Sequence, residues 1–299
     1  MRKTVIAAAA AAALAASIPA VAWAGGDTGA DTKGDSCKAG KGGHGGKHRS
    51  GHDLRVVGLT EDQCLVVFDT RKPGHLKPVG KVTGLAGDSK LVGIDFRVQD
   101  GKLYGVGDAG GIYTVDTEAA AAKVSQLSIA LNGAHFGVDF NPAADRLRVI
   151  SDTGQNLRHN VAEPAGTTAN DGTLTNPTMP PSTAMGVTGA GYTNNDLNPA
   201  TATTLFDIDT ANDRVSVQSP ANAGNLAPTG NLGVDAGPSA GFDVYYSPAD
   251  GTNQGYAALR TTEGYGFYSV NLLNGSAQHL GAFPGDHQVF DVALPLADN

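Results

Sequence analysis

The sequence predicts an all-β protein, a β-propeller of five four-stranded blades arranged in a ring. Three observations favour this fold: a segment recurs at a fixed spacing, apolar residues alternate with a period of two, and helical patterning is almost absent. The one helix-like run beyond the N-terminal region is EAAAAK at 118–123, which is expected to be a loop between strands. A β-sandwich or an open array of sheets is the alternative architecture.

The repeat is clearest in two stretches that align at a constant offset of 44 residues without a gap. Gly93 to Ile112 matches Gly137 to Asn156, and both begin with Gly-x-Asp-Phe. Each stretch predicts an extended segment, a turn, a second extended segment, a tight turn around Asp-x-Gly and a third extended segment. A fourth segment completes the unit, as at 76–82 and 123–129.

Further copies of these segments run through the rest of the chain. The first-segment pattern returns as GFDVYY from Gly241 and VFDVAL ending at Leu294, and in degenerate form as GVTGAGY from Gly186. The third segment recurs at 65–70, 112–117, 214–219 and 267–272, and the fourth at 225–233 and 276–283. Residues 54–299 hold 246 positions, so five units take about 49 residues each, inside the range typical of propeller blades.

The placement of the copies along the chain predicts how the ring closes. The first unit opens at Leu54 with LRVVGLT, a second-segment strand, and lacks a Gly-x-Asp-Phe strand of its own. The spare copy is VFDVAL at 289–294, at the other end of the chain. If this C-terminal strand completes the first unit, the ring closes and no sheet edge stays exposed at the join.

Several of these runs together resemble a known family. FGVDFNPAADRLRVISDTGQNLR (136–158), YTNN (192–195), LFDIDT (205–210) and NLGVD (231–235) resemble the bacterial domain-of-unknown-function family 4394. The resemblance covers nearly all of 54–294 and implies an exported, repeat-built β domain. It carries over no activity.

The first 24 residues have the layout of a secretory signal peptide. Arg2 and Lys3 give a basic start, an Ala-rich apolar run follows, and Ala22-Trp23-Ala24 forms a small-x-small cleavage site before Gly25. A membrane anchor is the alternative, but the run lacks a basic stop-transfer flank. No other stretch approaches the roughly 20 apolar residues that span a bilayer. We therefore expect a secreted protein, extracellular or in the cell envelope, without membrane insertion after cleavage.

Residues 25–53 are expected to form a flexible linker ahead of a propeller domain at 54–299. Apart from Cys37 they contain no apolar residue larger than Ala, so they cannot bury enough surface to offset the entropy of ordering. Three histidines recur every fourth residue and also suit a transition metal, although the Gly-rich context does not support a helix that would align them: His44, His48 and His52.

The chain has two cysteines, Cys37 in the linker and Cys64 near the start of the domain. Outside the cytoplasm two thiols often pair, and a bridge here would close a loop of about 28 residues. The alternative is two separate thiols, and the sequence leaves both open.

The charge of the domain excludes two classes of partner. Residues 54–299 carry 14 Lys and Arg against 25 Asp and Glu, a net charge of −11. Such a field repels nucleic acid and anionic membrane surfaces. A small molecule, a glycan or another protein remain as partners.

The Gly-x-Asp-Phe strands hold the first candidate site. The first strand of a propeller blade lies nearest the axis, and Gly there permits close approach of the backbones. Thr188 stands at the fifth position, and four units carry an aspartate: Asp95, Asp139, Asp243 and Asp291. Four carboxylates near one axis suit Ca²⁺, which prefers oxygen ligands. In the alternative interpretation each carboxylate accepts hydrogen bonds from a neighbouring blade's backbone or from an arginine.

Arg148 and Arg158 are a second candidate site, for an anionic ligand. If the turn between them centres on Thr153-Gly154, the two face each other across a hairpin, where like charges are destabilising. The compensating group is Asp139 or another carboxylate in one interpretation. In the other it is a bound anion, because arginine binds carboxylate and phosphate in a bidentate manner.

The motif matches do not establish catalysis. The G-x-G-x-x-G run at 105–110 lies in a strand-turn-strand hairpin and lacks the following helix that a dinucleotide site requires. We therefore expect a non-catalytic binding or cell-envelope interaction module. The alternative is a metal-assisted hydrolase or lactonase-like propeller, with Asp95, Asp139, Asp243 and Asp291 at its mouth.

We expect the exported protein to begin at Gly25, because the small-x-small site at 22–24 directly follows the apolar run. Intact-mass spectrometry of the exported protein checks this expectation. Exported protein that retains Met1 would contradict it.

Overall fold

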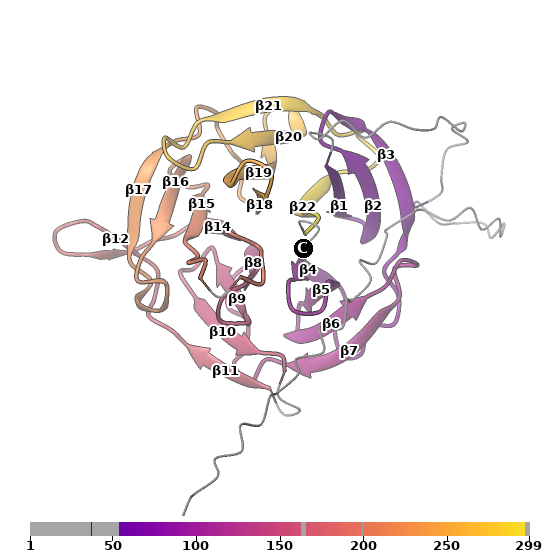
Figure 1. Cartoon of the computed structure of the whole chain (residues 1–299), viewed down its shortest axis with the longest axis horizontal. Coiled ribbons are helices and arrows are strands. Elements are labelled where there is room, and N and C mark those ends of the chain that lie inside the picture. Colours follow the sequence, from indigo (N-terminus) through magenta and orange to yellow (C-terminus); the bar gives the residue numbers. More distant parts are fainter. Residues whose placement is uncertain (1–36, 38–53, 163–165, 199, 297–299) are drawn as a thin grey trace, which may run out of the picture.

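The computed structural model describes residues 37, 54–162, 166–198 and 200–296. Five four-stranded antiparallel sheets surround a central axis as the blades of a propeller (Figure 1). The predicted signal peptide, the linker apart from Cys37, and the histidines at 44, 48 and 52 lie outside the described residues. The predicted fold class is confirmed.

Each blade runs from an inner strand beside the axis to an outer strand at the rim. Blade 1 holds β22 (Val289–Ala293), β1 (Arg55–Thr60), β2 (Cys64–Asp69) and β3 (Lys72–Lys81). Blade 2 holds β4 (Leu91–Arg97), β5 (Lys102–Gly107), β6 (Gly111–Val115) and β7 (Ala121–Gln126). Blade 3 holds β8 (Phe136–Asn141), β9 (Arg146–Ser151), β10 (Asn156–Asn160) and β11 (Thr167–Asn170).

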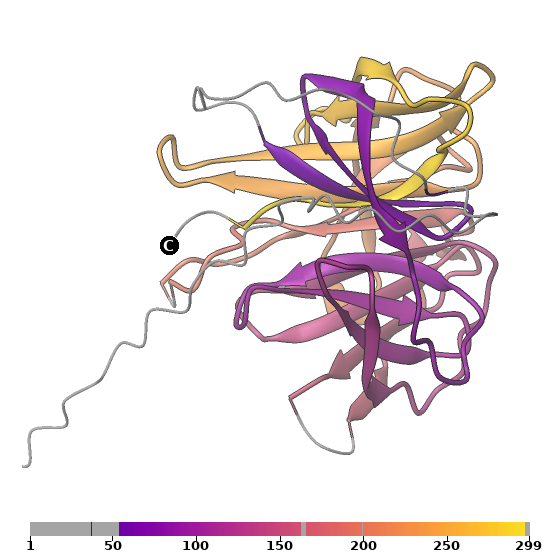
Figure 2. The same cartoon turned by 90° about the vertical axis from the view of Figure 1, so that its right-hand side faces the viewer.

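The last two blades follow the same order. Blade 4 holds β14 (Val187–Tyr192), β15 (Leu205–Asp209), β16 (Arg214–Gln218) and β17 (Leu226–Asn231). Blade 5 holds β18 (Ala240–Ser247), β19 (Thr252–Thr261), β20 (Gly264–Val270) and β21 (Ala277–Ala282). In the side view, the turn between β18 and β19 and the end of β22 lie on the same face of the ring (Figure 2).

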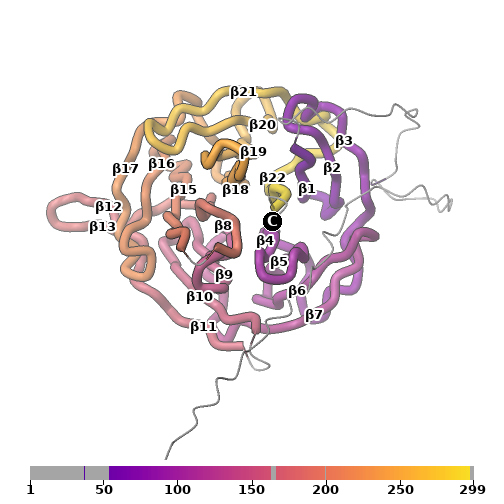
Figure 3. The backbone as a smooth tube through the Cα atoms, in the orientation of Figure 1, coloured from indigo at the N-terminus to yellow at the C-terminus, as the bar shows by residue number. Residues whose placement is uncertain are grey.

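Two short features interrupt the repeat. A small hairpin of β12 (Thr175–Asn176) and β13 (Ser182–Thr183) projects from the rim between blades 3 and 4 (Figure 3). The only helix in the described part of the chain is a single 3₁₀ turn, η1 (Ala221–Ala223). The run at 118–123 is only partly the predicted loop, because β7 begins at Ala121.

The hydrophobic core is divided among the interfaces between blades. Among the described residues, the buried apolar side chains form five clusters, and each cluster joins two neighbouring blades. The inner strands are mostly buried, and β14 is buried along its whole length, whereas the outer strands are largely exposed to solvent, as in β7. A blade therefore cannot bury its apolar faces without both of its neighbours.

The C-terminal strand closes the ring as predicted. β22 pairs antiparallel with β1, with Gly58 opposite Val292 and Leu59 opposite Asp291. Val289, Val292 and Leu294 are at most 2% exposed and pack against apolar side chains of blades 1 and 5. The first blade is thus assembled from the two ends of the domain.

A disulfide ties the segment before the domain to this closing blade. Cys37 and Cys64 are bonded, with their Cα atoms 5.8 Å apart. Of the two alternatives left open by the sequence, the structure has the paired one.

Truncation after Gly285 should leave a protein that cannot fold, because it removes the inner strand of blade 1. Burial of each apolar side chain of that strand is worth about 1.5–3 kcal/mol, whereas a whole domain is stable by only about 5–15 kcal/mol. Removal of residues 297–299 alone should leave the melting temperature unchanged. Circular dichroism and size-exclusion chromatography measure both variants; cooperative melting of the protein ending at Gly285 would contradict ring closure by β22.

Candidate functional site

Four aspartates on the inner strands join four of the five pairs of neighbouring blades around the axis. In each link a carboxylate oxygen accepts a hydrogen bond from a backbone N–H of the following blade, over distances between 2.6 and 3.2 Å. The pairs are Asp291 with Ile94, Asp95 with Phe140, Asp139 with Tyr192, and Asp243 with Leu294. We call these four contacts the axial clasp. They match the predicted alternative in which the aspartates bind a neighbouring blade's backbone.

In blade 4, the position equivalent to these aspartates is occupied by Gly191, and not by Thr188 as the sequence alignment predicted. Gly189 pairs with Ile208 as Gly137 pairs with Ile150, so the residue two positions later, Gly191, is the counterpart of Asp139. The pairing between β14 and β15 shifts between Val187 and Gly189, which displaces the motif from its expected place. A Cβ atom at Gly191 would lie 2.9 Å from Val244 Cγ2, so this position has no room for an aspartate.

Three asparagines join blades 4 and 5, the interface that lacks an aspartate. Asn195 Nδ2 donates to the carbonyl of Val244 over 3.1 Å. Asn194 and Asn253 exchange hydrogen bonds of 2.8 and 2.7 Å. Both asparagines of blade 4 come from the YTNN run, which therefore supplies the missing link.

Three of the four carboxylates meet on the axis. Asp95, Asp139 and Asp243 each offer an oxygen, and these oxygens lie within 4.8 Å of one another. We call these three residues the axial trio. None of the four aspartates is more than 6% exposed, so they lie inside the ring. The hydrolase alternative had expected them at an open mouth.

Burial and mutual repulsion raise the pKa values of these carboxyl groups. Burial is the largest cause for the pKa of Asp95, followed by repulsion from Asp243. The pKa of Asp139 is raised by burial and then by Asp95, and burial raises the pKa of Asp243 to about 6. Among the described residues, no ion pair joins a basic side chain to any of the four aspartates.

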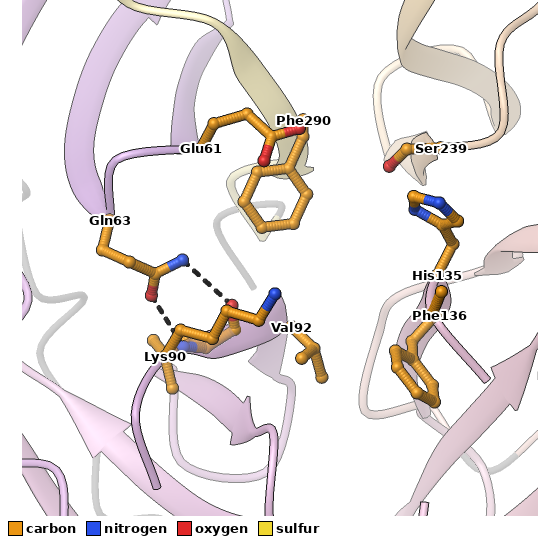
Figure 4. A pocket seen from close by; sticks show the side chains of 10 residues that line it. Glu61, Gln63, Lys90, Val92, His135, Phe136, Ser239 and Phe290 are labelled. Carbon is orange, nitrogen blue, oxygen red and sulfur yellow. Dashed lines mark hydrogen bonds between the residues drawn. The ribbon is translucent and has the colours of Figure 1, made fainter. Parts of the chain in front are cut away.

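A small pocket lies at the end of the axis where the inner strands begin. Its volume is about 90 Å³, and blades 1, 2, 3 and 5 contribute its walls. Glu61, Gln63 and Lys90 stand on one side, with His135 and Ser239 on the other (Figure 4). Val92 and Phe136, which also line it, precede the axial aspartates of their strands by three residues, about 10 Å along a strand. We call this pocket the axial mouth.

Ser239 and His135 are polar residues that the sequence reasoning did not single out as a pair. The signal for Ser239 was the G-x-S-x-G match GPSAG at 237–241. This run enters strand β18 and is not followed by a helix, so it is not a nucleophile elbow. No hydrogen bond joins Ser239 to His135 among the described residues, and the carboxylate of Glu61 accepts the Tyr265 hydroxyl. These residues do not form a catalytic triad.

A larger groove lies on the opposite face, at the seam between blades 1 and 5. Its volume is about 430 Å³, and its lining comes from the turn after β2 and from β19, β20 and β21: Thr70, Arg71, Gln254, Tyr256, Ser269 and Leu280. The Tyr256 ring lies parallel to that of Phe267, with centroids 5.5 Å apart. The Gln254 amide donates to the carbonyls of Gly255 and Val270. Ring stacking thus fixes the Tyr256 side chain, and hydrogen bonds fix that of Gln254. We call this the seam groove.

Arg148 and Arg158 face each other across the β9–β10 hairpin, as the predicted register requires. The compensating carboxylate is Asp171, which follows β11, and not Asp139. Asp171 Oδ2 lies 2.6 Å from Arg148 Nη1 and 3.0 Å from Arg158 Nε. The anion-binding role stays a prediction, and the burial of Arg148, which is 1% exposed, leaves no access for a ligand from solvent.

These features define the class of protein: a five-bladed β-propeller with a closed ring and buried axial carboxylates. The chain belongs to the family described as domain of unknown function (DUF4394), whose model matches residues 64–293. The predicted resemblance is confirmed. No curated protein matches the chain. In the described residues, no helix is long and apolar enough to cross a membrane.

Solved structures similar to this chain include three of low identity. A structural genomics protein of unknown function from Bacteroides thetaiotaomicron is 15% identical, with a TM-score of 0.43, and the match covers 82% of this chain and 62% of that one. The major Malassezia sympodialis allergen Mala s 1 is 14% identical, with a TM-score of 0.42 and coverages of 70% and 73%. An auxiliary nutrient binding protein from Bacteroides ovatus is 13% identical, with a TM-score of 0.40 and coverages of 67% and 55%. The chain spans less than two thirds of the first and third, and we draw nothing about function from these similarities.

The raised pKa of Asp243 predicts a loss of stability as the pH rises. A group whose pKa is higher in the folded than in the unfolded protein stabilises the fold most at low pH, and this contribution is lost through the folded pKa. For a shift from 3.8 to about 6, the loss is about 2 kcal/mol between pH 4 and pH 7. Urea unfolding with a chelator present should show this loss in the wild type and a smaller one in Asp243→Asn. Equal pH dependence in the two proteins would contradict the assignment.

Proposed function

We propose that this protein is a secreted, non-catalytic binding module that holds a glycan in the seam groove. The observation that carries the proposal is the groove itself, whose volume of about 430 Å³ lies in the range of 300–1,000 Å³ usual for ligand sites. The axial mouth, at about 90 Å³, has room for roughly three water molecules and not for a sugar ring.

The chemistry of the groove favours a glycan among the partner classes. A sugar ring has a face of C–H groups and a rim of hydroxyls. Tyr256 offers a rigid aromatic surface for the first, and Gln254 and Ser269 offer hydrogen-bonding groups for the second. The domain is acidic overall, which favours a neutral ligand over an anionic one.

Secretion is part of the proposal. The Cys37–Cys64 disulfide supports it, because disulfides persist mainly in oxidising compartments. The signal-peptide layout of residues 1–24 supports it as well. The module would then act outside the cell or in the cell envelope.

A metal-assisted hydrolase is supported less well. Such an enzyme needs its substrate to reach the carboxylates, and Asp95, Asp139 and Asp243 are at most 4% exposed. Ser239 and His135 line the axial mouth but have no hydrogen bond between them that would make the serine a nucleophile. The geometry therefore supports binding over turnover.

A glycan array probed with the full chain tests the function, followed by calorimetry on the strongest hit. Tyr256→Ala should weaken binding at least tenfold, because it removes the aromatic surface, whereas Tyr256→Phe should keep most of the affinity. Lys90→Ala, at the axial mouth on the other face, is the control and should bind as the wild type does. No binding to any glycan, equal binding by Tyr256→Ala, or release of hydrolysed product from the bound glycan would overturn the proposal.

A further inference from the structure

We propose that the axial trio of Asp95, Asp139 and Asp243 binds one Ca²⁺ ion on the propeller axis. The three carboxylate oxygens lie within 4.8 Å of one another. A point equidistant from three oxygens at that spacing lies about 2.8 Å from each, and Ca²⁺ binds oxygen at 2.3–2.6 Å. A closure of a few tenths of an ångström would bring all three oxygens into coordination. The site is independent of the seam groove and of any glycan.

One oxygen of the trio lacks a partner. Asp139 Oδ2 is buried and accepts no hydrogen bond from any described residue, although its neighbour Oδ1 accepts one from the Tyr192 amide. Buried carboxylate oxygens normally find a donor, and an orphaned one costs free energy. A cation beside Oδ2 would satisfy it.

The hydrogen bonds of the axial clasp hold the three carboxylates of the trio in orientations that suit a central ion. The amide of Phe140 holds Asp95, that of Tyr192 holds Asp139, and that of Leu294 holds Asp243. Each bond fixes a carboxylate from outside the cluster, as second-shell donors do around bound metals. None of these carboxylates has an arginine or lysine among the described ion pairs, so the negative charge of the cluster lacks a protein counterion.

The ligand chemistry selects Ca²⁺ among common divalent ions. The trio offers only oxygen, whereas Zn²⁺ sites usually include histidine or cysteine. Mg²⁺ usually keeps several waters in a strict octahedron, and a trio at most 4% exposed has little room for them. Ca²⁺ accepts irregular geometry and both oxygens of one carboxylate.

The ion would connect the inner strands of three blades. Asp95 is on β4 of blade 2, Asp139 on β8 of blade 3, and Asp243 on β18 of blade 5. Blades 3 and 5 are separated by blade 4, so a shared ion connects them across the axis. The axial mouth, with Glu61 in its lining, lies at one end of the inner strands that carry the trio. The expected role is stabilisation of the closed ring.

Metal analysis and melting of the full chain test the site. The protein is first stripped of metal with EGTA at pH 7.5 and then dialysed against Ca²⁺. Inductively coupled plasma mass spectrometry should then find one Ca²⁺ ion per chain. Saturation at 100 times the dissociation constant should raise the melting temperature by about 5–10 °C. At pH 5 the Ca²⁺ affinity should fall at least tenfold, because protons then compete for the same carboxylates. The charged groups that act on Asp139 are three further acids, namely Asp95, Asp243 and Asp291.

Two variants separate this site from general effects of a buried acid. Asp139→Asn should abolish the Ca²⁺-dependent rise in melting temperature. Asp207→Asn is the matched control, because Asp207 is equally buried and lacks hydrogen-bond partners but lies outside the trio. It should keep the rise in full. If Asp139→Asn does not fold, the stoichiometry and its pH dependence in the wild type decide alone. A stripped protein that binds no Ca²⁺, or that melts at the same temperature with and without Ca²⁺, would overturn the proposal.

Discussion

The hydrogen bonds from inner-strand carboxylates to the amides of the next blade are the constraint on which the ring depends. Inner strands of different blades do not pair as a sheet, so their backbones approach the axis without the usual ladder between them. The axial clasp replaces that ladder at four of the five interfaces. Hydrogen bonds in a buried setting are stronger than those exposed to water, and these bonds also fix the register of neighbouring blades.

Glycine makes this close approach possible. A Cβ atom at Gly93 would lie 2.4 Å from Val138 Cγ2, and one at Gly241 would lie 2.4 Å from the Asp291 Cα. Any side chain at these positions would separate the blades and break the bonds of the aspartates two residues later. The Gly-x-Asp pairing is therefore one structural device: the glycine lets the strand approach, and the aspartate joins it to its neighbour. The same crowding concentrates acidic groups on the axis, which raises their pKa values and creates the geometry for a cation.

The sequence predicted those parts of the structure whose residue patterns recur along the chain. The Gly-x-Asp-Phe strands, the opposed Arg148 and Arg158, and the completion of blade 1 by 289–294 follow from spacing and period, because identical local patterns fold alike. Gly191 could not be placed, since the shift in pairing between β14 and β15 is not visible in the residues themselves. Asp171 and the seam groove depend on loops and on faces of different blades, and their proximity appears only when the ring is assembled.

Amide hydrogen exchange tests the central claim most directly, because it measures the clasp bonds one by one. The amides of Ile94, Phe140, Tyr192 and Leu294 donate to side chains and lie outside regular pairing between blades. If the axial clasp holds the ring together, these four amides should exchange only through global unfolding, as slowly as the core amides of the strands. Exchange of these amides at the rate of exposed loop amides, while the rest of β4, β8 and β14 stays protected, would contradict the account.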